Sequence, residues 1–214
     1  MRHIFKKGSE ESLPVLVLFH GTGGTEHDLI PLAETIAPGA SILSLRGNVS
    51  ENGMSRFFRR LAEGVFDEED LVFRTNEIWD FLTRAASEYD FDPANLVALG
   101  YSNGANIAAS LIFHDGGVFR GALLHHPMVP IRGLELPDLS AVNVFVGAGR
   151  NDGMVPSSNT EELIGLLESA GASVAASWEH AGHQLTRSEA DAAGRWFAEH
   201  FGGADGESEQ ESGQ

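Results

Sequence analysis

The chain has 214 residues, no cysteine and a formal net charge of −17 at pH 7. The lack of cysteine excludes disulfide bonds, a thiolate nucleophile and cysteine-bound metal, and the acidity disfavours binding to nucleic acid or to an anionic membrane. No apolar run reaches the roughly 18 residues of a membrane span, and none follows the N-terminal charges as in a signal peptide. We therefore expect a cytoplasmic protein.

Two interpretations of the acidity stay open. Of the 14 basic residues, only Lys6 and Lys7 are lysine. The chain is either an ordinary acidic protein or one adapted to a high-salt, halophilic cytoplasm, where salt screens the repulsion between carboxylates. The halophilic interpretation predicts a thermal stability that rises from low to molar salt.

Short apolar runs alternate with helical patterns along the chain. This alternation predicts an α/β fold, with a mainly parallel central sheet and helices on both faces. Four of the runs are dense in aliphatic residues, as strands buried on both faces require. In chain order, the expected strands lie at residues 3–5 (an edge strand), 15–19, 41–45, 96–99, 121–125, 142–146 and 173–178.

The intervening segments have apolar residues at helical spacing. We expect Pro31 in the first turn of the first helix and Ser188 as the N-terminal cap of the last. Residues 1–201 are interpreted as one compact, nearly lidless domain, and residues 202–214 as a disordered acidic tail without an apolar anchor. The expected helices lie at residues 28–36, 70–89, 105–113, 160–170 and 188–201.

The connection over residues 47–69 is unusually long for a compact domain. It combines several arginines with Phe57, Phe58 and Phe66. Connections of this length are often functional, so we expect it to cover a binding pocket with these rings near the mouth. The alternative is surface decoration with a short helix.

Ser102 is the candidate nucleophile. Residues 96–105 read L-V-A-L-G-Y-S-N-G-A, which is an apolar strand, a G-x-S-x-G motif and a helix start. In such a nucleophile elbow the serine lies on a strained strand-to-helix turn, and Gly100 and Gly104 allow strand and helix to approach closely. The helix N-terminus favours developing negative charge.

A glycine-rich loop follows the strand at 15–19 and reads H-G-T-G-G at residues 20–24. Backbone N–H groups in such a loop stabilise the oxyanion formed in acyl transfer. The two expected donors are the N–H groups of Thr22 and Asn103. A phosphate-binding loop is the rival interpretation, but neither phosphate motif is present. We expect His20 to orient this loop.

A nucleophilic serine needs a base and an orienting acid, in the chain order Ser, Asp, His. Asp152 follows the strand at 142–146, at the strand ends where sites of open α/β sheets gather. His183 and His180 compete for the role of base, and we favour His183 because it opens the loop before the last helix. The adjacent His125 and His126 should point to opposite faces of a strand, so no metal site is expected there.

We expect the reaction to need no cofactor and no metal. The remaining candidate residues are ones that would contact the substrate. They lie in the glycine-rich loop, the elbow, the long connection and the loop after Asp152. These candidate substrate-binding residues are His20, Gly21, Tyr101, Phe57, Phe58 and Met154.

Several motifs agree in order and spacing with one known group of proteins. They are H-G-T-G-G at 20–24, G-Y-S-N-G-A at 100–105, G-R-N-D-G-M-V-P at 149–156 and G-H-Q-L at 182–185. Together they resemble the phospholipase/carboxylesterase family. The segments 46–58, 61–71 and 125–130 are similar to its bacterial branch associated with hydroquinone and quinone response.

This resemblance covers nearly all of residues 1–201. It implies an α/β-hydrolase fold and an ester hydrolase whose triad is Ser102, Asp152 and His183. The related acyl-protein thioesterases have G-F-S-Q-G at the elbow, whereas this chain has Tyr101 and Asn103. That departure argues against activity on lipidated proteins.

The resulting hypothesis is a serine carboxylesterase for short-chain alkyl or aryl esters. The alternatives are a lactone or ring-fission-product hydrolase in aromatic metabolism, a lysophospholipase or acyl thioesterase, and a non-catalytic binding protein of the same fold. The expected partner is a small-molecule ester, and the sequence leaves a homodimer open.

Overall fold

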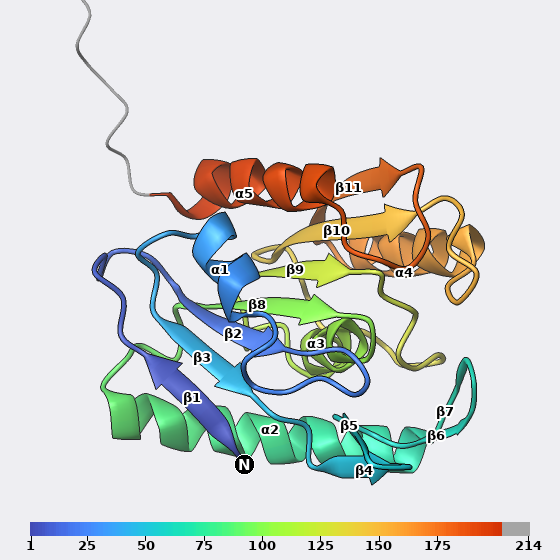
Figure 1. Ribbon diagram of the computed structural model, residues 1–214, viewed down its shortest axis with the longest axis horizontal. Helices are drawn as coiled ribbons and strands as arrows, with labels where there is room; N and C mark the ends of the chain where they lie inside the picture. The colour runs from blue at the N-terminus through green and yellow to red at the C-terminus, as the bar shows by residue number, and fades with distance from the viewer. Residues whose placement is uncertain (203–214) are drawn as a thin grey trace, which may run out of the picture.

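The computed structural model describes residues 1–202, which form a seven-stranded sheet between two layers of helices (Figure 1). The strand order is β1-β3-β2-β8-β9-β10-β11, and β1 alone runs antiparallel to its neighbour in this sheet. The expected fold class is therefore confirmed. The strands are β1 (His3–Lys6), β2 (Val15–Phe19), β3 (Ile42–Leu45), β8 (Leu96–Tyr101), β9 (Gly121–His125), β10 (Asn143–Gly149) and β11 (Ser173–Glu179).

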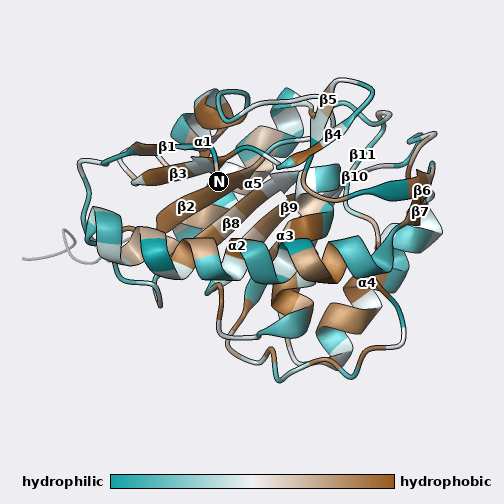
Figure 2. Ribbon diagram, turned by 90° about the horizontal axis from the view of Figure 1, so that it is seen from below, coloured by the Kyte–Doolittle hydropathy of each residue, from teal (hydrophilic) through white to brown (hydrophobic). Residues whose placement is uncertain are grey.

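The sheet is buried on both faces, and β2 shows why. Val15, Val17 and Phe19 belong to one core cluster, whereas Leu16 and Leu18 belong to the other, because successive strand residues point to opposite faces. Helices α2, α3 and α4 contribute to the first cluster, and α1 and α5 to the second. Figure 2 shows α2 and α3 lying across the first face. The helices are α1 (Ile30–Ile36), α2 (Glu68–Tyr89), α3 (Asn103–His114), α4 (Ser157–Ser169) and α5 (Arg187–Phe201).

The start of α5 differs from the expectation. Oγ1 of Thr186, not the side chain of Ser188, accepts the hydrogen bond from the N–H of Glu189 at 3.1 Å. The Ser188 hydroxyl instead donates to Glu179 at 2.7 Å. Thr186 takes the capping position because a cap must lie two or three residues before the N–H that it binds. The prediction of Pro31 in the first turn of α1 is confirmed.

The long connection before α2 folds into two small hairpins rather than a helix. The first pairs β4 (Val49–Glu51) with β5 (Met54–Arg56), and the second pairs β6 (Arg60–Ala62) with β7 (Val65–Phe66). Both lie at the same end of the molecule in Figure 1, beside the start of α2. The alternative interpretation, surface decoration with a short helix, is therefore wrong, and the hairpins contribute to the site described below.

Apart from Gly202, the tail expected over residues 202–214 lies outside the described residues. Within residues 1–202, no helix combines the length and the apolar character needed to cross a membrane.

Candidate active site

Ser102 occupies a strained turn between β8 and α3. Its backbone has φ 52° and ψ −116°, a combination that costs a non-glycine residue about 1–3 kcal/mol. Gly104 permits the turn, since a Cβ there would lie 1.9 Å from the carbonyl oxygen of Phe19. The Ser102 N–H is held by the carbonyl oxygen of His125 at 2.9 Å. The turn thus has the local geometry of a nucleophile elbow.

Ser102, His183 and Asp152 lie in one hydrogen-bonded line. The Nε2 atom of His183 is 2.9 Å from Oγ of Ser102, and its Nδ1 atom is 2.7 Å from Oδ2 of Asp152. The competing His180 is exposed. Because an ionised carboxylate only accepts hydrogen bonds, Nδ1 of His183 carries the proton and Nε2 faces the serine hydroxyl as an acceptor.

Asp152 is fixed by the backbone as well as by His183. Its Oδ1 atom accepts hydrogen bonds from the N–H groups of Met154 and Val155 at 2.8 and 3.0 Å. Burial alone would raise the pKa of Asp152, but the hydrogen bond from His183 and these two N–H groups outweigh burial and lower it. The carboxylate is therefore ionised at neutral pH and able to stabilise a positively charged His183.

The residues proposed as oxyanion donors, Thr22 and Asn103, line one cavity together with Ser102. The segment Ser55 to Phe57 holds both of them. Nη1 of Arg56 donates to Oγ1 of Thr22 at 2.6 Å, and the N–H of Phe57 donates to Oδ1 of Asn103 at 2.8 Å. The carbonyl oxygen of Ser55 also accepts from the N–H of Gly23 at 2.8 Å. The end of the first hairpin and the residue that follows it thus hold Thr22 and Asn103 in place.

The cavity beside Ser102 is small, with a volume of about 40 Å³. Met154, half exposed, lies on its wall as expected. The hairpins add Arg56, Arg60 and Phe66, so the long connection does contribute to a pocket. Arg56 and Arg60 share one carboxylate, Glu51. Glu63 also lines this cavity, so the two guanidinium groups lie among two carboxylates and the wall is polar rather than positively charged.

Two aromatic rings expected at the pocket mouth lie elsewhere. Phe57 and Phe58 are 1% and 0% exposed and belong to the core, where their rings contact Phe19 and Phe66 edge to face. The prediction that Phe57 and Phe58 contact substrate is therefore corrected. Phe57 and Phe58 lie in the link between the two hairpins, and the hydrophobic effect favours burial of their rings in the core.

His20 orients its loop, as expected, and does not line the cavity. Its Nδ1 atom lies 2.6 Å from the carbonyl oxygen of Gly21, and its Nε2 atom accepts from the N–H of Gly47 at 3.1 Å. Burial lowers the pKa of His20 despite its hydrogen bond to Gly21, which fits a neutral ring with one donor and one acceptor. Its expected contact with substrate is corrected, because both ring nitrogens are already occupied.

Gly21 and Tyr101 line a second hollow that shares Thr22 with the first cavity. The Tyr101 hydroxyl donates to the backbone carbonyl oxygen of His183 at 2.7 Å. Tyr101 therefore holds the loop that carries the histidine. The sequence around Tyr101 could not predict this hydrogen bond, because its acceptor lies 82 residues later in the chain.

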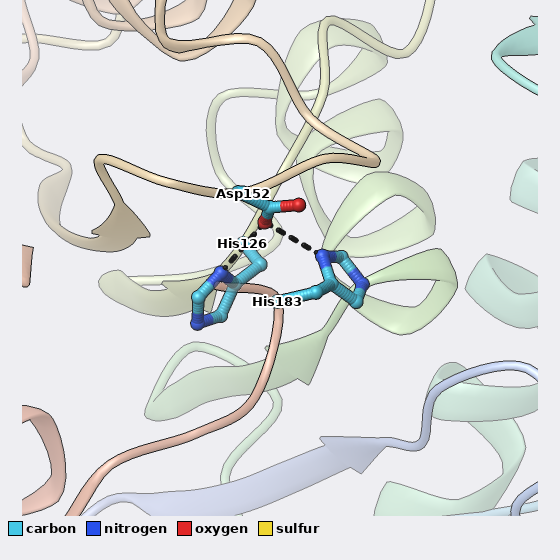
Figure 3. A group of neighbouring side chains, drawn as sticks. All are labelled: His126, Asp152 and His183. Carbon is cyan, nitrogen blue, oxygen red and sulfur yellow. Dashed lines mark hydrogen bonds and ion pairs between the residues drawn. The ribbon is translucent and has the colours of Figure 1, made fainter. Parts of the chain in front are cut away.

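Sequence reasoning missed a buried polar cluster behind Asp152. Nδ1 of His126 lies 3.1 Å from Oδ2 of Asp152, the oxygen that His183 also contacts, as Figure 3 shows. Nδ1 of His125 and Nε2 of His126 both contact Glu189, at 2.5 and 3.3 Å. The expectation that the two histidines diverge is wrong, because His126 leaves the strand with φ 53°.

His126, Asp152 and His183 form the one group within the described residues whose donor atoms lie close enough to hold a metal ion, all within 4.8 Å. Their arrangement is that of a hydrogen-bonded cluster. Both rings direct Nδ1 at the same oxygen of Asp152, and each such contact uses an N–H proton rather than the lone pair that a metal requires.

The mainly parallel sheet and the strand–serine–helix elbow, followed along the chain by Asp152 and His183, define an α/β-hydrolase. Residues 58–207 match the model of the Dienelactone hydrolase family, and the chain belongs to this family. It is 54% identical over 199 residues to the Bacillus subtilis (strain 168) protein named "Putative hydrolase MhqD", a match that covers 93% of this chain and 98% of that protein.

Solved structures agree with this assignment. A Bacillus cereus carboxylesterase superposes with a TM-score of 0.93 and 59% identity over 94% of this chain and 95% of that one. The protein YahD, solved with malic acid, gives a TM-score of 0.89 and 35% identity over 93% and 98% of the two chains. The chain is thus a hydrolase of this family, similar in sequence and fold to carboxylesterases as its motifs indicate.

Proposed function

We propose that the chain is a serine carboxylesterase that hydrolyses short-chain alkyl or aryl esters through an acyl-enzyme intermediate. The observation that carries the proposal is the line of hydrogen bonds from Ser102 through His183 to Asp152, at 2.9 and 2.7 Å, beside a cavity. A serine hydroxyl is a weak nucleophile, and a neutral imidazole held by a carboxylate is the arrangement that activates it.

In the first step, Oγ of Ser102 attacks the ester carbonyl carbon while Nε2 of His183 takes the hydroxyl proton. The carbonyl oxygen becomes negative, and the N–H groups of Thr22 and Asn103 stabilise it. When the tetrahedral intermediate collapses, the bond from carbon to the alkoxy oxygen breaks. The imidazolium of His183 gives its proton to the leaving alcohol, and the acyl group stays on Ser102.

In the second step, a water molecule attacks the acyl carbon with Nε2 of His183 as the base. Collapse of the second intermediate returns the proton to Oγ of Ser102 and releases a carboxylic acid. Asp152 stays ionised throughout and stabilises each imidazolium state. No step draws on a group from outside the chain other than substrate and water.

The cavity volume of about 40 Å³ supports small acyl groups over long lipid chains. Arg56, Arg60 and Glu63 on the wall offer polar contacts to the remainder of a small ester. A second candidate function is lactone hydrolysis, favoured by the family match. A lactone is a cyclic ester, so the same residues would open its ring and leave the hydroxyl and the acid in one product.

A substrate panel tests both candidates. Rates are measured for p-nitrophenyl acetate, butyrate and palmitate, for phenyl acetate and for small lactones, using wild type and Ser102→Ala. We expect turnover of the short esters, far slower turnover of palmitate, and loss of all turnover in the variant. Lactones hydrolysed faster than every open ester would replace the first candidate by the second, and palmitate hydrolysed as fast as acetate would refute the short-chain preference.

A further inference from the structure

We propose that His126 is a positioning residue for the proposed reaction, a charged imidazolium that holds the Asp152 carboxylate in the place where it meets His183. The inference rests on the function proposed above. It assigns a role to a buried histidine, and to the glutamate behind it, that the hydrolytic steps themselves do not use.

The charge on His126 follows from its contacts. Its Nδ1 atom faces Oδ2 of Asp152 at 3.1 Å and its Nε2 atom faces Oε2 of Glu189 at 3.3 Å. Neither ionised carboxylate can donate a hydrogen bond, so both ring nitrogens must do so, and only the imidazolium has two N–H groups. The side chains of His126 and Glu189 are fully buried and that of Asp152 is 1% exposed, so water does not replace either contact.

Glu189 is the fixed anchor of this cluster. It projects from the first turn of α5 and also receives Nδ1 of His125 on its other oxygen. Burial alone would raise the pKa of Glu189, but the hydrogen bonds and charges of His125 and His126 bring it to about 2. In the same way, burial would lower the pKa of His126, and its bonds to Glu189 and Asp152 raise it instead.

The backbone is shaped to make room for the anchor. A Cβ at Gly147 in β10 would lie 1.9 Å from Oε1 of Glu189, so only glycine lets the carboxylate reach the sheet. The carbonyl oxygen of Gly147 also accepts from the N–H of His126 at 2.7 Å. At this position the backbone of His126 has φ 53°, a left-handed conformation that is uncommon for residues other than glycine.

The consequence for chemistry comes from one shared atom. Oδ2 of Asp152 receives both His126 and His183, whose ring centres are 5.2 Å apart (Figure 3). The position of this oxygen therefore depends on His126 as well as on His183. The rings of Tyr101 and His183, the carboxylates of Asp152 and Glu189, and His125 behind Glu189 are the titratable groups that surround His126.

The split between kcat and KM on p-nitrophenyl acetate tests this role. In His126→Gln, Oδ2 of Asp152 loses its charged donor, and displacement of a catalytic group by about 1 Å can cost up to ~100-fold in rate, so kcat should fall by about 10-fold or more while KM stays near the wild-type value. The matched control is His125→Gln, because His125 contacts Glu189 but not Asp152, and its kcat should stay near the wild-type value. An unchanged kcat in a folded His126→Gln would overturn the proposal.

A second measurement needs neither activity nor a variant. Nitrogen-15 NMR of histidine-labelled wild type at pH 8, which is above the ordinary pKa of an imidazole, should show one ring protonated at both nitrogens. A spectrum without such a ring would refute the inference. This outcome is distinct from failure of the esterase proposal, because a doubly protonated His126 in a protein without esterase turnover would leave the charge assignment intact and remove only its reaction.

Discussion

Arg56 donates a hydrogen bond from Nη1 to Oγ1 of Thr22 at 2.6 Å. This bond joins the first hairpin to the loop that carries one of the proposed oxyanion donors. Arg56 is itself buried, with Nε bound to the carbonyl oxygen of Phe58 at 3.2 Å. The first hairpin therefore helps to set the geometry of the candidate site.

Replacing Arg56 should lower kcat more than it raises KM. In Arg56→Met, Thr22 loses its side-chain anchor, and displacement of a catalytic group by about 1 Å can cost up to ~100-fold in rate. We expect a fall in kcat between about 10-fold and 100-fold on p-nitrophenyl acetate. Arg60→Met is the matched control: it removes the same charge from the cavity wall and the same partner from Glu51 but does not touch Thr22. Equal losses of kcat in both variants would show that charge, not the bond to Thr22, matters.

A methyl group at Gly147 should destabilise the protein. It would meet Oε1 of Glu189 at 1.9 Å, and overpacking of a buried site costs about 1–3 kcal/mol. We expect Gly147→Ala to lower the melting temperature clearly. Gly153→Ala, where a Cβ would meet nothing within 4 Å, should leave it near the wild-type value. An unchanged melting temperature in Gly147→Ala would mean that Glu189 can move away from the sheet without loss of stability.

Glu189 should make the fold sensitive to acid. Its pKa falls from 4.5 to about 2 on folding, so the stability it contributes is fully present above pH 4.5 and is lost as the pH drops towards 2. The free energy of unfolding of wild type should therefore fall more steeply over this range than that of Glu189→Gln. Urea titrations at several pH values measure both slopes, and parallel slopes would contradict the shifted pKa.

Salt should decide between the two interpretations of the acidity. If the net charge of −17 reflects adaptation to high salt, screening should raise the melting temperature steadily from about 0.1 M to molar potassium chloride. Differential scanning calorimetry across this series gives the answer. A melting temperature that does not respond to salt would leave the chain as an ordinary acidic protein.

Local patterns predicted much of the fold. The apolar run at β2 and the strand–turn–helix pattern around Ser102 match the structure. Both features depend on residues close together in the chain, namely a dense apolar run and the glycines that flank the serine, so local patterns can predict them. The cap of α5 was predicted two residues too late, at Ser188 instead of Thr186, because its position is set by a single hydrogen bond to the N–H of Glu189. Aromatic residues alone could not show whether Phe57 faced the pocket or the core.

The buried cluster behind Asp152 could not be predicted from the sequence. It joins β9, the loop after β10 and the start of α5, over as many as 64 residues of chain. Its formation depends on the left-handed backbone of His126 and on the space beside Gly147. Neither feature leaves a periodic pattern, and a glutamate in the first turn of a helix looks like an ordinary favourable charge near the helix N-terminus.

Labelling with a fluorophosphonate tests the central claim most directly, because such probes react with an activated serine and not with an ordinary hydroxyl group. Wild type and Ser102→Ala are incubated with the probe in low and in molar salt, digested, and examined by mass spectrometry. The account predicts one adduct, on Ser102, that is absent from the variant. A folded wild type without an adduct, or with the adduct on another residue, would contradict the assignment of Ser102 as the nucleophile.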